Sequence, residues 1–323
     1  MKNISQRIKS ALILLTILLP FLFITYYGKI SGKIIGISFF TLISVWATYE
    51  VLSHSILARW QNILISILSI LIWAFPLDWF SNNTQSNNIF IHNANKIGFN
   101  IEELILQLKK AVFFSEDSLT SFKALSVICL VTLISLIYLF NLFFTKKSLK
   151  EFIVSYIVAI FSTIFIPISF KTLFLYNSAS LYFIFAIISI PVVTDTSAYI
   201  GGSLFGRKII KVGMAPKISP KKSWEGGFIG FIFGSLFVFI TMYLGKLTNN
   251  LQFIIFSNWK QLLVGIILLP FISIIGDLAF SLIKRLYGVK DFSNLIPGHG
   301  GFMDRFDSSS FVVIGVSVIL LIR

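Results

Sequence analysis

The sequence predicts an all-α integral membrane protein with about nine transmembrane helices and a polar site that faces the cytoplasm. Apolar residues make up 56% of the 323 residues and charged residues only 12%, whereas ordinary soluble domains carry about 25% charged residues. The mean hydropathy is +0.88, which is typical of a chain that lies mostly in lipid. Composition therefore excludes a soluble globular enzyme and a disordered chain. The single cysteine, Cys129, excludes an internal disulfide.

A further observation supports the same fold: nine apolar stretches, most of them close to the ~20 residues that cross a bilayer. They run over residues 11–27, 34–52, 61–79, 124–144, 152–170, 179–200, 227–245, 262–281 and 309–322. Lys and Arg set the orientation, because cytoplasmic loops carry an excess of both. With the N-terminus in the cytoplasm, the inside segments hold 17 of the 27 basic residues. Both glycine-rich polar loops of the C-terminal half then lie inside.

The long outer segment, residues 80–123, begins with an asparagine-rich stretch that is typical of a loop. A helix is expected after it, because Asn100 and Glu103 fit a capping-box pattern. The apolar residues of this helix fall on one face. Two interpretations stay open: a helix that lies in the outer membrane interface, and a lid that packs on the spans.

The distribution of acidic residues divides the chain into an N-terminal region, 1–170, and a C-terminal catalytic region, 171–323. The spans of the first region have almost no acidic residues, whereas the second has several in or beside its spans. An ionisable residue inside a span costs at least ~2.5 kcal/mol on insertion scales. Such residues are functional candidates, so we expect the site in the C-terminal half.

Asp195 and Asp277 follow long apolar runs, toward the cytoplasmic ends of their helices. On one helix Asp277, Ser281 and Lys284 lie within about 60° of each other. Arg285 is adjacent to them. Such a face is suited to a metal ion and phosphates. The structural alternatives are an Asp277–Lys284 arrangement that only neutralises both charges, and an Asp195 that only faces water at a helix end.

A basic loop, residues 205–227, contains the sequence ISPKKSWEGG. Attachment to anionic lipid explains part of its charge, but anchoring does not require this mixture of groups. Four residues are suited to hold a triphosphate through charges and hydrogen bonds: Ser219, Lys221, Lys222 and Ser223. Glu225 is expected to complete a metal site or to cap the next helix. Glycines repeat every four residues from Gly226, which predicts a close approach of two helices.

A second polar loop, residues 289–310, has glycines on both sides of His299. Backbone N–H groups in such a loop can bind phosphate oxygens. Further polar candidates surround this histidine: Gly300, Gly301, Asp304, Arg305 and Asp307. The density of acidic, basic and glycine residues distinguishes this loop from an ordinary solvated one.

The stretch SLIKRLYGVKDFSNLIPGHGGFMDRFD, residues 281–307, resembles the signature of CDP-diacylglycerol synthases, also called phosphatidate cytidylyltransferases. The pattern is S-x-φ-K-R, then K-D, then P-x-H-G-G-φ-x-D-R-φ-D, with φ apolar. Every fixed position is filled, with Lys290 and Asp291 as the K-D pair. Two earlier blocks, DTSAYIGGSLFGRK and ISPKKSWEGG, also resemble the family, although Ser223 stands where the family often has Thr. The specific match covers residues 195–307.

This resemblance implies a reaction in which the phosphate of phosphatidic acid attacks the α-phosphorus of CTP, giving CDP-diacylglycerol and pyrophosphate. It also implies Mg²⁺, with Asp195, Asp277 and Asp304 as candidate metal ligands. The groups expected to neutralise the phosphates are Lys221, Lys222, Lys284, Arg285 and Arg305. The expected partners are CTP, phosphatidic acid and the bilayer of the cell membrane, and no nucleic acid. A homodimer stays open.

Two other functions also stay open. A CTP-dependent lipid-alcohol kinase would transfer the γ-phosphate and release CDP, so the product separates it from the synthase. A secondary transporter for an anionic solute would also place charges in its helices. The charges cluster at one face, however, and the N-terminal half shows no inverted-repeat counterpart.

Overall fold

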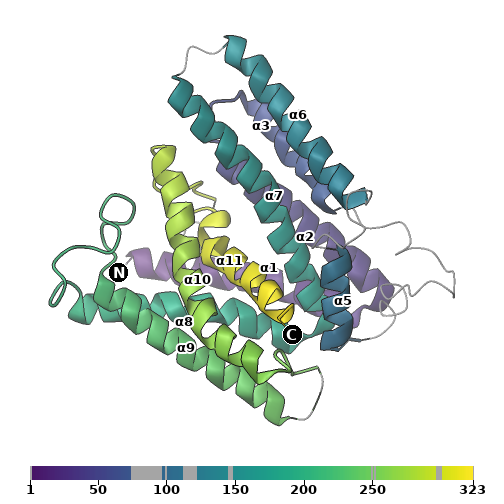
Figure 1. Cartoon of the computed structure of the whole chain (residues 1–323), viewed down its shortest axis with the longest axis vertical. Coiled ribbons are helices and arrows are strands. Elements are labelled where there is room, and N and C mark those ends of the chain that lie inside the picture. The colour runs from purple at the N-terminus through teal and green to yellow at the C-terminus, as the bar shows by residue number, and fades with distance from the viewer. Residues whose placement is uncertain are drawn as a thin grey trace. The chain divides into compact units, whose positions relative to one another are not determined.

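The computed structural model describes residues 2–73, 97–98, 100–111, 122–144, 148–248, 250, 252–295 and 300–322. Within these ranges every regular element is a helix (Figure 1), apart from one isolated bridge between Ala215 and Ser219. The helices are α1 (Lys2–Tyr27), α2 (Lys29–Leu52), α3 (Arg59–Leu68), the 3₁₀ helix η1 (Ser69–Trp73), α5 (Ile101–Ala111), α6 (Phe122–Phe144), α7 (Leu149–Ala179), α8 (Leu181–Phe205), α9 (Trp224–Leu247), α10 (Trp259–Leu286) and α11 (Met303–Leu320). The all-α prediction is confirmed for the described residues.

Six of the described helices are long and apolar enough to cross a membrane: α2, α6, α7, α8, α9 and α10. They coincide with six of the nine predicted stretches. Two other stretches correspond to shorter apolar helices, Leu15–Tyr27 and Arg59–Trp73, and residues 74–79 of the second of these stretches lie outside the described residues. The last stretch overlaps α11 up to Leu320. The protein is therefore a helical, multi-pass membrane protein.

The described residues form two compact units. Residues 1–97, 106–178 and 291–304 belong to the first, and residues 98–105, 179–290 and 305–323 to the second. In the first unit an apolar core gathers side chains from α2, α3, α6 and α7, among them Leu52, Ile65 and Tyr138. The buried Tyr138 hydroxyl has a polar partner, Ser155 Oγ, at 2.9 Å.

Two buried lysines bind helix ends in the first unit. Lys33 Nζ donates to the carbonyl oxygens of Thr25 at 2.8 Å and Ser178 at 3.2 Å, near the ends of α1 and α7. Lys171 Nζ donates to the carbonyl of Ile72 at 3.0 Å. Terminal carbonyls lack intrahelical partners, so an ammonium group there is favourable. Helix α7 runs on to Ala179, beyond its predicted end at residue 170.

In the second unit α8 and α9 lie side by side, and α10 packs against both (Figure 1). A Cβ atom at Gly230 would lie 2.7 Å from the Cβ of Ala198, and one at Gly226 would lie 2.7 Å from the carbonyl oxygen of Ala198. A side chain at either glycine would separate the helices. The close approach predicted from the glycine repeat is therefore present between α9 and α8.

Helix α5 begins directly after Asn100, where the capping pattern places its start. Its Leu104 and Leu108 are almost fully buried. Burial of the apolar face favours the lid over a helix that exposes this face to lipid. The asparagine-rich loop predicted before it, and residues 112–121 after it, lie outside the described residues.

Candidate active site

The second unit contains a cavity of about 380 Å³ among α8, α9, α10 and the loop between α8 and α9. Five predicted site residues line it: Asp195, Lys221, Lys222, Ser223 and Asp277. The other lining residues are Ala198, Tyr199, Gly202, Ser203, Met214, Gly227 and Ile274. Two carboxylates and two amines thus share one concave surface that is built on candidate spans.

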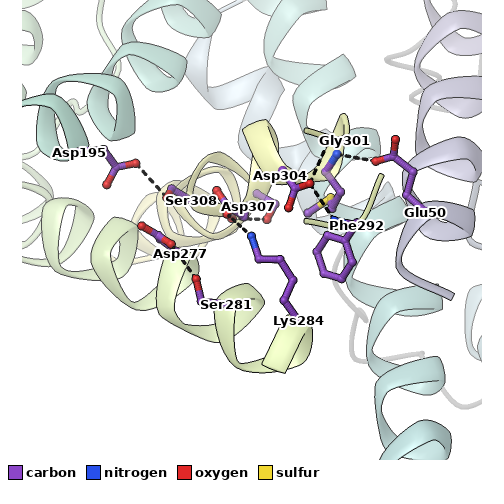
Figure 2. A network of polar contacts seen from close by, with 12 residues as sticks. Glu50, Asp195, Asp277, Ser281, Lys284, Phe292, Gly301, Asp304, Asp307 and Ser308 are labelled. Atoms are coloured by element: carbon purple, nitrogen blue, oxygen red, sulfur yellow. Dashed lines mark hydrogen bonds and ion pairs between the residues drawn. The ribbon is translucent and has the colours of Figure 1, made fainter. Parts of the chain in front are cut away.

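The Asp277 carboxylate binds a cation and a hydroxyl. Its Oδ2 lies 2.5 Å from Lys222 Nζ, and its Oδ1 accepts a hydrogen bond from Ser281 Oγ at 3.1 Å (Figure 2). Lys222 comes from the loop, so the ion pair ties the loop to α10. Both charged side chains remain about a quarter exposed, at 26% and 25%. A phosphate or a cation can therefore reach them from the cavity.

Ser308 links Asp195 to Asp307, which is a contact that the sequence analysis did not foresee. Its Oγ donates to Asp195 Oδ2 at 3.2 Å, and its backbone N–H donates to Asp307 Oδ1 at 2.7 Å (Figure 2). Lys284 Nζ lies 3.8 Å from Asp307 Oδ2. Burial raises the pKa of the Asp307 carboxyl and the charge of Asp277 acts in the same direction, whereas Lys284 opposes both. These groups extend the polar network of α10 toward α11.

Glu225 fixes the loop between α8 and α9. Its carboxylate accepts the backbone N–H groups of Arg207 at 3.1 Å, Ile209 at 3.0 Å and Ile210 at 2.8 Å. The N-terminus of α9 is capped instead by Ser223, whose Oγ accepts a backbone N–H at 3.2 Å. The carboxylate therefore caps the loop, and Ser223 takes the helix-capping role. The expected part of Glu225 in a metal site stays a prediction.

Arg285 also braces loops. Its Nε donates to the carbonyl of Ile218 at 3.0 Å, and its Nη1 donates to the carbonyl of Val289 at 3.0 Å. Like Arg285, the other predicted residues of the second unit do not line the cavity: Ser219, Glu225, Ser281, Lys284, Lys290, Arg305 and Asp307. Their direct contact with phosphate stays a prediction.

The motif residues in the first turn of α11 and in the loop before it form a cluster in the first unit. Asp304 Oδ2 accepts backbone N–H groups from Phe292 at 2.9 Å and Gly301 at 2.8 Å (Figure 2). The Asp304 side chain therefore folds back from the first turn of α11 onto the preceding loop and fixes the shape of that loop. Its role as a third metal ligand stays a prediction.

The glycine pair makes a turn that a side chain would disturb. Gly300 has φ +83°, a left-handed conformation that favours glycine. A Cβ atom there would lie 3.0 Å from Asp304 Oδ2 and 3.5 Å from the Cβ of Asp291. Asp291 itself is exposed. His299, the predicted phosphate-loop histidine, lies outside the described residues.

Glu50 holds the same loop from α2, a contact of the N-terminal half that the sequence analysis did not foresee. Glu50 is 2% exposed. Its Oε1 accepts hydrogen bonds from Ser293 Oγ at 2.8 Å and the Phe302 N–H at 3.1 Å, and its Oε2 accepts one from the Met303 N–H at 2.9 Å. A buried carboxylate thus caps the start of α11.

Comparison with known proteins adds the family. Residues 1–322 match the family described as the cytidylyltransferase family. The chain belongs to this family. A 161-residue stretch is 37% identical to a Staphylococcus aureus (strain COL) protein named phosphatidate cytidylyltransferase, and covers 50% of this chain and 57% of that relative. A Staphylococcus haemolyticus protein of the same name is 41% identical over 160 residues, with the same coverage.

A plant relative matches as well. Phosphatidate cytidylyltransferase 4, chloroplastic, of Arabidopsis thaliana is 41% identical over 124 residues, which are 37% of this chain and 27% of the relative. The chain therefore spans little more than half the length of the staphylococcal relatives that it matches, and about a quarter of the plant relative.

The cavity offers Asp195 and Asp277 as oxygen ligands. Mg²⁺ is usually held by one or two carboxylates together with substrate phosphates and waters. Within the described residues no group of three or more His, Cys, Asp or Glu could hold a metal ion. The donors therefore fit a Mg²⁺ ion that binds together with a nucleotide, and they do not form an all-protein metal cage.

Proposed function

We propose that this protein is a membrane nucleotidyltransferase that converts CTP and phosphatidic acid to CDP-diacylglycerol and pyrophosphate. The observation that carries the proposal is the cavity. It combines Asp195 and Asp277, on helices long enough to span a membrane, with Lys221 and Lys222 from the loop between α8 and α9. A triphosphate requires positive charge and metal-binding oxygens, and a phospholipid requires a site within reach of the bilayer. The names of the relatives support the same reaction.

In the proposed reaction a phosphate oxygen of phosphatidic acid attacks the α-phosphorus of CTP. The bond between the α-phosphorus and the oxygen that bridges to the β-phosphate breaks, and this oxygen leaves with pyrophosphate. Lys221 and Lys222 neutralise the charge that develops on the phosphates, which is the main contribution of a protein to such transfers. Phosphatidic acid is already anionic, so the reaction needs no strong general base.

The proposal includes Mg²⁺, with Asp195 and Asp277 as ligands and Asp304 as a third candidate. A divalent ion supplies charge neutralisation and alignment of the triphosphate. Lys222 supplies part of the same positive charge, because its Nζ lies 2.5 Å from Asp277 Oδ2. Lys284 and Arg285 add positive charge on the same helix end.

We further propose that residues 11–27, 61–79 and 309–322 complete nine spans, and that the cavity faces the cytoplasm of a cell membrane. The excess of Lys and Arg in the loops assigned to the inside supports this orientation. The test uses Lys217→Cys, an exposed loop position, in a background with Cys129→Ser. A membrane-impermeant maleimide should label inside-out vesicles and not sealed cells. Labelling of sealed cells would reverse the orientation.

The proposed reaction is tested with purified protein, CTP labelled in the base or in the γ-phosphate, phosphatidic acid and Mg²⁺. Labelled CDP-diacylglycerol and labelled pyrophosphate are the expected products. Release of CDP with a phosphorylated lipid would indicate a lipid kinase instead. Uptake of an anionic solute by proteoliposomes without CTP turnover would indicate a transporter.

A further inference from the structure

The loop that follows α8 exposes apolar side chains among basic ones. Ile209 is 83% exposed and Val212 is 65% exposed, and Arg207, Lys208 and Lys211 around them are exposed as well. Single exposed apolar residues are common on proteins, but a contiguous exposed apolar patch marks an interaction site. Apolar and basic side chains alternate within a few residues here, so the chemistry of the surface is mixed.

Hydrogen bonds fix the backbone beneath these side chains. The buried Glu225 carboxylate accepts the N–H groups of Ile209 at 3.0 Å and Ile210 at 2.8 Å, and the Arg207 guanidinium donates to the carbonyl of Pro220. An inward turn of Ile209 would break charge-assisted hydrogen bonds to a carboxylate that is withdrawn from water. The loop therefore presents Ile209 outward in a fixed conformation.

The exposed surface continues along α8 and borders the cavity. Ile200, Leu204 and Phe205 on the last turns of α8 are 51%, 56% and 51% exposed, and α8 is a candidate span. Ser203 and Met214, which flank the loop on both sides, line the cavity. A molecule bound along residues 204–212 is thus next to the cavity wall.

We propose that residues 204–212 form a surface that binds anionic phospholipid at the membrane interface and delivers it to the cavity. The proposal rests on the proposed function, and it names the residues that collect the lipid substrate. Exposed apolar side chains reach the acyl boundary of a bilayer, and Lys or Arg beside them attract anionic headgroups. The three basic residues match the anionic headgroup of such a lipid, and the apolar residues between them match its acyl chains.

The first test measures the KM for phosphatidic acid, as a mole fraction in mixed micelles, for Ile209→Ser combined with Val212→Ser. We expect this KM to rise about fivefold, because less apolar surface reaches the lipid, while the KM for CTP and the kcat at saturating lipid stay at wild-type values. The matched control is Leu244→Ser, which lies 52% exposed near the other end of α9. It should leave all three constants unchanged. An unchanged KM for phosphatidic acid in the double variant would overturn the proposal.

The second test does not depend on activity. A fluorophore on Ile209→Cys, with Cys129→Ser, is placed in nanodiscs that contain brominated phosphatidic acid or brominated phosphatidylcholine. Bromine quenching should be at least about twofold stronger with the anionic lipid, and a fluorophore on Lys217→Cys should be quenched by neither. Equal quenching by both lipids, or none, would overturn the proposal. If the wild-type protein is inactive but still shows selective quenching, the proposed reaction is refuted, whereas the proposed lipid-binding surface is supported.

Discussion

Glu50 accepts a hydrogen bond from the backbone N–H of Met303, 253 residues later in the chain, at 2.9 Å. With the Phe302 N–H and Ser293 Oγ on its other oxygen, the carboxylate is surrounded by donors. A side chain at the end of α2 therefore holds the loop that contains the most characteristic motif of the sequence. The N-terminal half contributes to the shape of this loop as well as to the apolar spans.

Glu50→Ala should lower the free energy of unfolding by about 2–4 kcal/mol, because it leaves buried backbone N–H groups without an acceptor. Glu50→Gln should cost about half as much, since one acceptor oxygen remains. Thermal unfolding in detergent measures both. Glu151→Gln, an exposed glutamate at the start of α7, is the control and should stay within about 0.5 kcal/mol of wild type. A Glu50→Ala protein as stable as wild type would contradict the capping role.

The sequence could not assign this role to Glu50. An acidic residue at the end of an apolar stretch is ordinarily an interfacial residue that faces water. Its partners are backbone N–H groups, which every residue except proline provides, so no residue pattern near position 300 points back to position 50. The contact arises from tertiary packing within the first unit. Ser308 was missed for a related reason, since a serine after Asp307 is unremarkable until α8 places Asp195 beside it.

Asp277→Asn should reduce turnover at least about 10³-fold, because it removes a charge that faces the triphosphate in the proposed site. Stability should change by less than about 1 kcal/mol, since the Lys222 side chain, 26% exposed, can be solvated once its partner is neutral. Release of pyrophosphate from CTP and phosphatidic acid measures turnover. Ser281→Ala removes only a hydroxyl bonded to Asp277 and should lose less than about tenfold. Near-normal turnover of Asp277→Asn would remove Asp277 from the mechanism.

The cavity shows what sequence patterns predicted well. Asp195 and Asp277 were selected because charges in apolar spans are rare, and Lys222 because its loop mixes groups that suit a triphosphate. All three line one cavity. Six of the nine predicted apolar stretches form helices of spanning length, because the length of a span can be predicted from the run of apolar residues. Glu225 and Arg285 were selected as charged residues next to these candidates, but they bind backbone groups of loops. Charge alone does not distinguish a ligand of phosphate from a brace for a loop.

Lys284→Met should destabilise the protein more at high pH than at low pH. Lys284 Nζ lies 3.8 Å from Asp307 Oδ2, and both side chains are nearly buried. Burial raises the pKa of Asp307 in the folded state, and loss of the lysine charge raises it further. In the unfolded chain the carboxyl of Asp307 has a pKa of about 3.9. Between this pKa and the raised pKa of Asp307 in the folded variant, the unfolded state binds fewer protons than the folded state. The stability of the variant therefore falls as the pH rises through this window.

Chemical denaturation at about pH 5 and about pH 8 measures this effect, and the loss relative to wild type should be larger at the higher pH. Lys284→Met combined with Asp307→Asn removes the titrating group and should abolish the pH dependence of the difference. The two substitutions should couple by about 1–3 kcal/mol. A loss that is the same at both pH values would show that the two charges do not interact.

Gly230→Ala should lower the free energy of unfolding by about 1–3 kcal/mol, although alanine is the better helix former, because the overpacking cost exceeds the propensity gain of about 1 kcal/mol. The added Cβ would lie 2.7 Å from both the Cβ of Ala198 and the carbonyl oxygen of Thr194, so α8 and α9 would have to separate. Gly227→Ala is the matched control on the same helix. Its Cβ would meet only Met214, with the flexible Sδ at 3.1 Å, so alanine should be neutral or stabilising there. If Gly230→Ala proved as stable as Gly227→Ala in detergent unfolding, the four-residue glycine repeat would reflect composition and not the contact between α8 and α9.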